Sequence, residues 1–129
     1  MESWGVLIWV AVGGGAGAVS RYGIGLLSQQ WIAPDFPIGT LSANMLGCFL
    51  MGLLLGSDIG ENHPVAKLAI GSGFLGSLTT FSTFSAETMT QLNQQQYLVA
   101  AGYAMLSVIG GVLLTLLGMS LVGAFRAQA

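Results

Sequence analysis

Long apolar segments alternate with short polar stretches along the whole chain. The apolar segments cover about residues 4–27, 38–55, 65–92 and 97–125, and the polar stretches lie at 28–37, 58–64 and 93–96. A helix needs about 20 mostly apolar residues to cross the hydrocarbon core of a bilayer. The pattern therefore predicts an all-α integral membrane protein, built as a single domain of four transmembrane helices.

The third apolar segment, about residues 65–92, differs from the other three. As one unbroken helix it would be roughly 42 Å long, well beyond a hydrocarbon core of about 30 Å. Glycine, serine and threonine are concentrated between Gly71 and Glu87, and such residues are weak helix formers. Non-helical backbone inside a membrane is tolerated only where protein buries it or where it lines a wet path. We predict a functional break near 76–80; the alternative is a continuous helix whose small residues allow close packing.

Composition supports a membrane protein and argues against an enzyme. The chain is 53% apolar and only 6% charged, with a mean hydropathy of +0.77, whereas soluble domains are about a quarter charged. A net charge of -2 with only three basic residues gives little attraction for nucleic acid. No nucleophile is paired with a base, and no set of side chains has metal-ligand spacing. The single cysteine, Cys48, is expected to be a packing residue.

Polar side chains recur at helical spacing inside the apolar segments. Thr40 and Asn44 lie one turn apart on one helix face. Another stripe, along the last segment, consists of Tyr103, Ser107, Gly111 and Thr115. Hydroxyls and amides need partners in hydrocarbon. These residues therefore either form helix–helix hydrogen bonds or provide donors along a solvated path.

Two aromatic residues at the predicted break add to this set of donors. Phe81 and Phe84 are three residues apart and share a helix face. The edge of a phenyl ring is electropositive, so both rings could present their edges to an anion; the alternative is ordinary packing. Hydrogen-bond donors without basic side chains suit a small anion that is held but not trapped. Carbonyl groups freed at the break could also coordinate a cation.

Charged residues are few, and one carboxylate lies deep in an apolar segment. Glu87 is a candidate for a proton relay, for an ion pair with Arg21, or for a polar contact near the membrane surface. Four spans would place Lys67 and Arg126 at one side of the membrane and Arg21 toward the other. This is almost no positive-inside bias. The chain could therefore insert in both orientations and pair with an oppositely oriented copy.

Glycines at helical spacing predict close helix packing. Gly13 and Gly17 share a face with Arg21, and Gly52 and Gly56 form a similar pair in the second segment. Small residues at this spacing let neighbouring helices approach closely. His63, in a polar stretch beside a proline, is expected to be a solvated side chain with no metal-binding role.

These motifs together resemble the Fluc (CrcB) family of fluoride channels. The likeness covers nearly the whole chain and rests on Gly73-Phe-Leu-Gly-Ser-Leu-Thr-Thr-Phe-Ser-Thr-Phe-Ser-Ala-Glu87, on Gly39-Thr-Leu-Ser-Ala-Asn44 and on Gly14 to Arg21. The resemblance implies an antiparallel, dual-topology homodimer with two pores in the bacterial inner membrane. It also implies that toxic fluoride leaves the cytoplasm passively through these pores.

The resemblance also implies roles for individual residues. The pore would be lined by Phe81, Phe84, Asn44, Ser82, Thr83, Tyr103, Ser107 and Thr115. The backbone carbonyls of Gly76 and Thr79 would hold a structural sodium ion on the dimer axis, and no organic cofactor is expected. Arg21 and Glu87 match family positions without an assigned role. Ser77 and Gly111 depart from the family pattern, which prefers a glycine and a hydroxyl there; a water molecule or a backbone group would fill the step at Gly111.

Two other functions fit the same residues. A proton-coupled exporter of small solutes would depend on Glu87 and on a proton gradient. A non-transporting assembly subunit would use its glycine faces only for packing. The three hypotheses differ in whether fluoride moves, and in whether a proton gradient is needed to move it.

Overall fold

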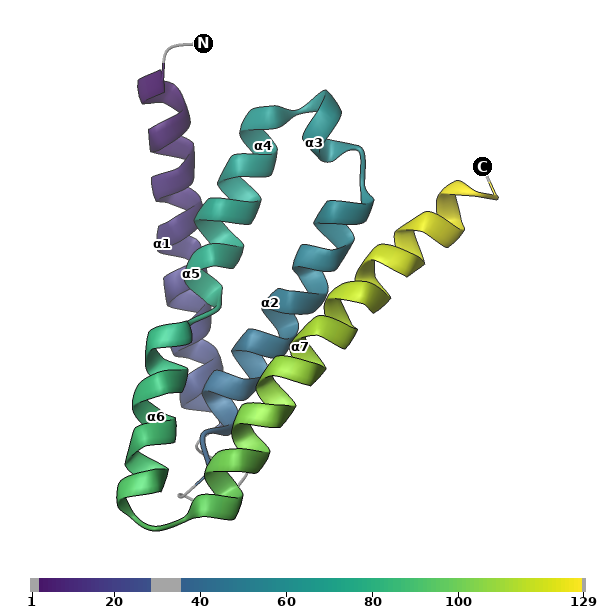
Figure 1. Ribbon diagram of the computed structural model, residues 1–129. Coiled ribbons are helices and arrows are strands. Elements are labelled where there is room, and N and C mark those ends of the chain that lie inside the picture. Colours follow the sequence, from purple (N-terminus) through teal and green to yellow (C-terminus); the bar gives the residue numbers. More distant parts are fainter. Residues whose placement is uncertain (1–2, 29–35, 129) are drawn as a thin grey trace.

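The computed structural model describes residues 3–28 and 36–128, and no strand occurs within these ranges. Most of the predicted loop at 28–37, namely residues 29–35, lies outside the described residues. The helices in chain order are α1 (Ser3–Ser28), α2 (Ile38–Gly56), α3 (Ile59–Asn62), α4 (Pro64–Leu68), η1 (Ala69–Leu75), α5 (Gly76–Leu78), α6 (Phe81–Asn93) and α7 (Tyr97–Arg126). Figure 1 shows that both ends of the chain and the α3–α4 connection lie toward the same end of the molecule.

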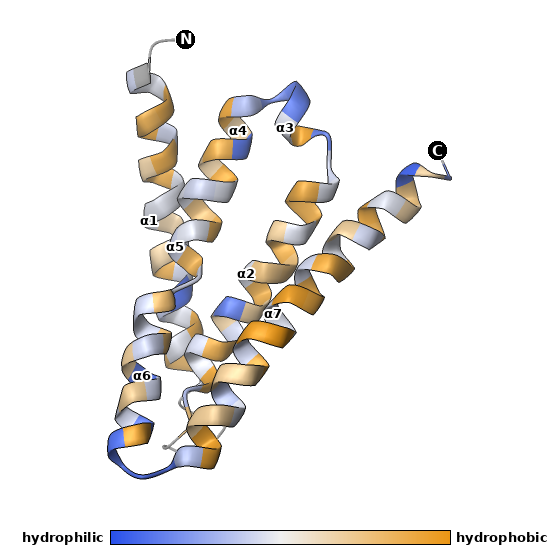
Figure 2. Ribbon diagram, in the orientation of Figure 1, coloured by the Kyte–Doolittle hydropathy of each residue, from blue (hydrophilic) through white to orange (hydrophobic). Residues whose placement is uncertain are grey.

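Two of the described helices, α2 and α7, are long and apolar enough to cross a membrane. The other described helices are too short or not apolar enough. Glycines and Arg21 lower the hydropathy of α1, and the third apolar segment is divided among α4, η1, α5 and α6. In Figure 2 the hydrophobic colour follows the shafts of the long helices, while hydrophilic residues gather at α3 and at the α6–α7 turn.

The third apolar segment is broken within the predicted range. It begins as α4, widens into the seven-residue π-helix η1 and returns to α-helix for the three residues of α5. Thr79 and Thr80 then adopt extended backbone, with φ/ψ of -83°/152° and -149°/116°. The helix restarts at α6, where the Thr80 hydroxyl caps the first turn by accepting a 3.2 Å hydrogen bond from the Thr83 N–H. A continuous helix is therefore excluded.

Glycine faces bring the helices into backbone contact. Gly13 and Gly17 of α1 lie against the carbonyl oxygens of Ala69 and Phe74, and a methyl group at either glycine would collide with them. Gly52 of α2 lies equally close to the Thr115 carbonyl of α7. The predicted packing role of these glycines is confirmed. The contact between α1 and η1 holds the segment before the break in place.

We expect Gly17→Ala to destabilise the protein by about 1–3 kcal/mol, because the added methyl meets the backbone of η1 and α5 rather than a flexible side chain. Thermal unfolding of the purified protein in detergent measures the effect. Gly15→Ala is the matched control, since a Cβ at Gly15 has no neighbour within 4 Å. An equal loss of stability in both variants would contradict the packing argument.

Arg126 connects the C-terminal ends of α2 and α7. The Arg126 guanidinium donates a 3.2 Å hydrogen bond to the Gly56 carbonyl at the end of α2 and forms an ion pair with Asp58. His63, in the neighbouring α3–α4 connection, is exposed as predicted. Among the described residues no group of three or more His, Cys, Asp or Glu side chains could hold a metal ion.

Candidate functional site

At the break, the Asn44 side chain of α2 forms hydrogen bonds with the Thr80 backbone in place of the missing helical ones. Its Oδ1 accepts a 2.7 Å hydrogen bond from the Thr80 N–H, and its Nδ2 donates a 3.3 Å hydrogen bond to the Thr80 carbonyl. In a continuous helix the Thr80 N–H would donate to the Gly76 carbonyl. The amide therefore stabilises the extended backbone and leaves the Gly76 carbonyl without its usual partner. One further N–H of the amide remains for another acceptor.

A pocket of about 240 Å³ lies between the break and α7. It is lined by Asn44, Cys48, Thr79, Thr80, Phe81, Phe84, Ser107 and Val108. The Phe81 and Phe84 rings lie 5.6 Å apart between centroids and are tilted by 42°. Within the described residues the buried Ser107 hydroxyl has no hydrogen-bond partner. The pocket thus combines a free hydroxyl, an amide and two phenyl rings, and its lining contains no charged side chain.

Glu87 joins three helices through hydrogen bonds to both of its carboxyl oxygens. Thr40 of α2 donates to Oε1, and the fully buried Tyr103 of α7 donates to Oε2, both at 2.7 Å. The Tyr103 ring packs against Phe84 with centroids 5.2 Å apart. Among the described residues Arg21 forms no ion pair with Glu87, because the one ion pair found there joins Arg126 to Asp58. The predicted partnership of Glu87 with Arg21 is therefore not formed within the described chain.

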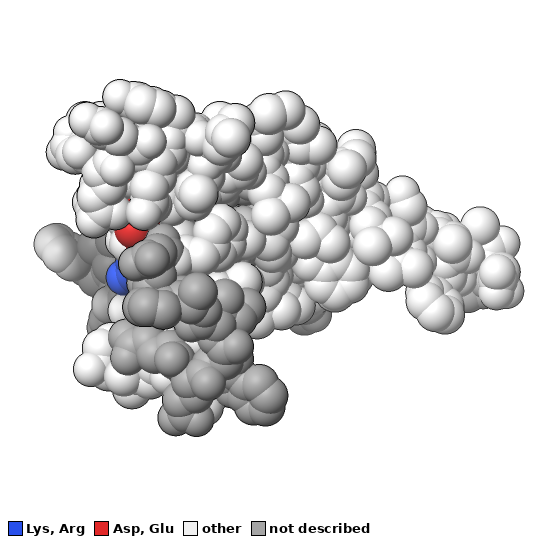
Figure 3. Space-filling model, turned by 90° about the horizontal axis from the view of Figure 1, so that it is seen from below, with Lys and Arg blue, Asp and Glu red and all other residues white. Residues whose placement is uncertain are grey.

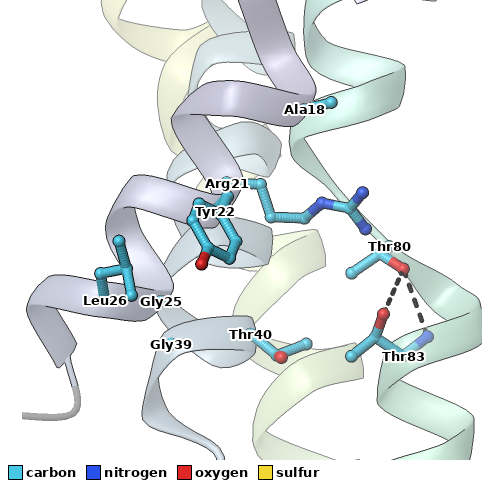
Figure 4. A pocket seen from close by; sticks show the side chains of 9 residues that line it. All are labelled: Ala18, Arg21, Tyr22, Gly25, Leu26, Gly39, Thr40, Thr80 and Thr83. Atoms are coloured by element: carbon cyan, nitrogen blue, oxygen red, sulfur yellow. Dashed lines mark hydrogen bonds between the residues drawn. The ribbon is translucent and has the colours of Figure 1, made fainter. Parts of the chain in front are cut away.

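Arg21 instead lines a second pocket, of about 360 Å³, between α1, α2 and the break. Its lining consists of Ala18, Arg21, Tyr22, Gly25, Leu26, Gly39, Thr40, Thr80 and Thr83. In Figure 4 the Arg21 guanidinium extends toward Thr80, whose hydroxyl donates to the Thr83 hydroxyl at 3.0 Å.

Charge is sparse on the face drawn in Figure 3, which shows one small basic and one small acidic area.

The remaining predicted pore residues do not line the first pocket. The Thr115 hydroxyl is turned to the backbone, with the carbonyls of Cys48 and Gly111 as acceptors at 3.1 and 3.0 Å. Ser82 is exposed, with its hydroxyl 3.3 Å from that of Thr80. At Gly111, where the hydroxyl stripe is interrupted, the Cys48 sulfur lies 3.1 Å from the position of a Cβ. A cysteine sulfur therefore adjoins this step.

Sequence reasoning missed three residues of the first pocket. Cys48 was predicted only to pack, and Thr80 and Val108 were not assigned to the site, yet all three line it. One signal was available for Cys48, which lies one turn after Asn44 on the same face of α2. No spacing rule could have paired Thr80 with Asn44, because their hydrogen bonds join different helices across the break.

Comparison with known proteins places the chain in a family. A family model described as "CrcB-like protein, Camphor Resistance (CrcB)" matches residues 8–119. The "Fluoride-specific ion channel FluC 1" of Staphylococcus aureus strain NCTC 8325 / PS 47 is 44% identical over 118 residues, which cover 90% of this chain and 95% of that protein. The "Fluoride-specific ion channel FluC" of Shewanella pealeana is 49% identical over 105 residues, covering 81% of this chain and 84% of that one.

A third relative, the "Fluoride-specific ion channel FluC" of Polynucleobacter asymbioticus, is 42% identical over 118 residues that cover 90% of this chain and 94% of the relative. These matches extend over nearly every described helix, including the break and α7. They confirm the resemblance noted from the sequence motifs, and the chain belongs to the CrcB family.

Proposed function

We propose that this protein is a fluoride-selective channel, not an enzyme, which lets fluoride leave the bacterial cytoplasm passively through the inner membrane. Relatives named as fluoride-specific ion channels support this proposal. The observation that carries it is the pocket beside the break, where the Ser107 hydroxyl has no partner among the described residues. That hydroxyl is therefore available to donate a hydrogen bond to an ion in the pocket.

The chemistry of the pocket fits a small, strongly hydrated anion. An anion that leaves water needs several close donors in its place, and the pocket offers the Ser107 hydroxyl, the second N–H of Asn44 and the edges of Phe81 and Phe84. A fixed cation in the lining would bind the anion strongly and slow its release. The neutral lining therefore favours transit over tight binding.

A second copy of the chain would complete the pore. The Phe81 side chain is 79% exposed in the single chain, although it lies at the centre of the family motif. Exposed apolar side chains also run along α7, and apolar surface of this extent is covered by lipid or by a partner. We infer an antiparallel homodimer with two pores, in which α7 and the break of each copy face the other. The weak charge bias between Arg21 and the pair Lys67 and Arg126 agrees with insertion in both orientations.

The carbonyl groups at the break fit a sodium ion. The Gly76 carbonyl lacks its usual helix partner, and Thr79 adopts extended backbone that directs its carbonyl out of the helical pattern. Hard cations such as sodium prefer oxygen ligands of this kind, as in the broken helices of transporters. Gly76 and Thr79 from two copies would therefore hold a structural sodium ion and join the two breaks.

Fluoride efflux from liposomes that contain the purified protein tests the function directly. A fluoride electrode measures release down a fluoride gradient, and chloride release is followed in parallel. We expect rapid fluoride release without a pH gradient and no chloride release. Release that requires an imposed proton gradient would favour the proton-coupled exporter, and no release from a folded dimer would favour an assembly subunit.

Substitution of Glu87 distinguishes a passive channel from a proton-coupled exporter. Both carboxyl oxygens accept hydrogen bonds from Thr40 and Tyr103, so in Glu87→Gln the new NH2 group reverses one of these bonds, and that hydroxyl must accept instead of donate. We expect fluoride efflux to change by less than about tenfold, since one rearranged hydrogen bond changes a barrier by at most about 1–1.5 kcal/mol. The efflux that remains should not depend on a pH gradient. Abolition of a strictly proton-driven flux would instead assign Glu87 to proton coupling.

A further inference from the structure

Two glutamines at the α6–α7 turn have buried polar atoms without hydrogen-bond partners among the described residues. Gln91 is only 3% exposed. Within the described part of the chain, its Oε1 and Nε2 and the Oε1 of Gln96 have no hydrogen-bond partner. Each buried polar atom left in this condition costs about 1–3 kcal/mol, and proteins nearly always satisfy such atoms with protein groups or ordered water. These amides therefore point to a bound partner outside the described part of the chain.

Gln91 extends the polar face of α6 that carries Glu87. Phe84, Glu87 and Gln91 follow one another at helical spacing and share one side of the helix. Phe84 and Glu87 both contact Tyr103 of α7, which fixes the direction of that face toward α7. Gln91 therefore lies between the two helices, about one helical turn nearer to the α6–α7 connection than Glu87.

Gln96 begins the matching face of α7. The buried residues Ala100 and Tyr103 follow it at helical spacing, and Ser107 continues the same side. The backbone N–H of Gln96 donates to the Gln91 carbonyl at 2.9 Å, so the two residues bracket the turn. Figure 1 shows α6 and α7 joined there as a hairpin. Polar groups thus continue from the Ser107 pocket, past Glu87 and Tyr103, to Gln91 and Gln96.

The three polar atoms select the ligand by its chemistry. Nε2 of Gln91 is a donor, whereas Oε1 of Gln91 and Oε1 of Gln96 are acceptors. An anion can only accept and a metal cation can bind only the oxygens, but water both donates and accepts. Buried waters typically make about three hydrogen bonds.

We propose that Gln91 and Gln96 bind ordered water at the α6–α7 turn. This water rehydrates the permeating anion where a path between α6 and α7 ends at the turn. The water site stands on the buried amides alone. Its part in ion transit rests on the proposed fluoride conduction. The site gives the permeating ion hydrogen-bond donors at the point where those of the protein end.

Gln91→Met tests both parts of the proposal, because it keeps the length of the side chain and removes both polar atoms. In a high-resolution crystal structure of the wild-type protein we expect a water molecule within hydrogen-bond distance of Gln91 and Gln96, and in the variant we expect none. Fluoride efflux from liposomes should fall about tenfold, with thermal stability unchanged or increased because a buried polar group has been removed. Gln94→Met, at an exposed position of the same turn, should change neither efflux nor stability.

The possible results separate the two parts. Wild-type density in which protein atoms alone satisfy both amides would overturn the water site, whether or not the variant folds. Bound water in the wild type combined with unchanged efflux in Gln91→Met would overturn its role in transit. If the wild-type protein releases no fluoride at all, the proposed function and the transit role fail together, and the crystallographic result alone decides the water site.

Discussion

Phe84→Ile is expected to reduce fluoride efflux roughly 100-fold, which corresponds to about 2.7 kcal/mol in the barrier. The Phe84 ring lies between two other aromatic rings, with centroids 5.6 Å from Phe81 and 5.2 Å from Tyr103. Isoleucine keeps an apolar side chain of similar size but has no electropositive ring edge to present to an anion. Liposome efflux with a fluoride electrode measures the loss.

Phe125→Ile is the matched control for this substitution. Phe125 is 74% exposed near the end of α7 and lines neither described pocket near the break. The control should conduct as the wild type does, and both variants should elute as folded dimers. If Phe84→Ile conducts normally, the rings serve packing alone and the pocket is not the pore.

Asn44→Asp is expected to abolish measurable fluoride efflux while the protein remains folded. The aspartate keeps an oxygen that accepts the Thr80 N–H, so the extended backbone retains the shorter of its two bonds, at 2.7 Å. It loses both amide N–H donors and, when ionised, places a negative charge in the pocket, where an anion would be repelled. Asn44→Ala should additionally lower the stability by about 1–3 kcal/mol, because the Thr80 N–H is left without a partner.

Efflux and thermal unfolding distinguish the two Asn44 variants. Asn62→Asp provides the control for the added charge, because Asn62 is exposed at the end of α3. Normal stability in Asn44→Ala would show that the break does not depend on this amide. Normal efflux in Asn44→Asp would remove the amide from the conduction path.

The sequence by itself determined the class of the protein, because apolar segments and helical spacing are local properties. The all-α architecture, the glycine faces at Gly13, Gly17 and Gly52, and a break in the third segment all follow from residue type and periodicity. Family motifs around Phe81 and Phe84 added the hypothesis of a fluoride channel, since they are specific and continuous in sequence.

Only the tertiary structure decided how the polar residues are divided. Periodicity placed Tyr103, Ser107 and Thr115 on one stripe, yet Ser107 lines the pocket, Tyr103 donates to Glu87 and Thr115 bonds to the backbone. Each outcome depends on which group of a neighbouring helix lies opposite, and a one-dimensional pattern contains no information on that partner. For the same reason the Asn44–Thr80 pair and the buried amide of Gln91 emerge only when the helices are packed together, because hydrogen bonds between helices are fixed by packing geometry rather than by spacing along one chain.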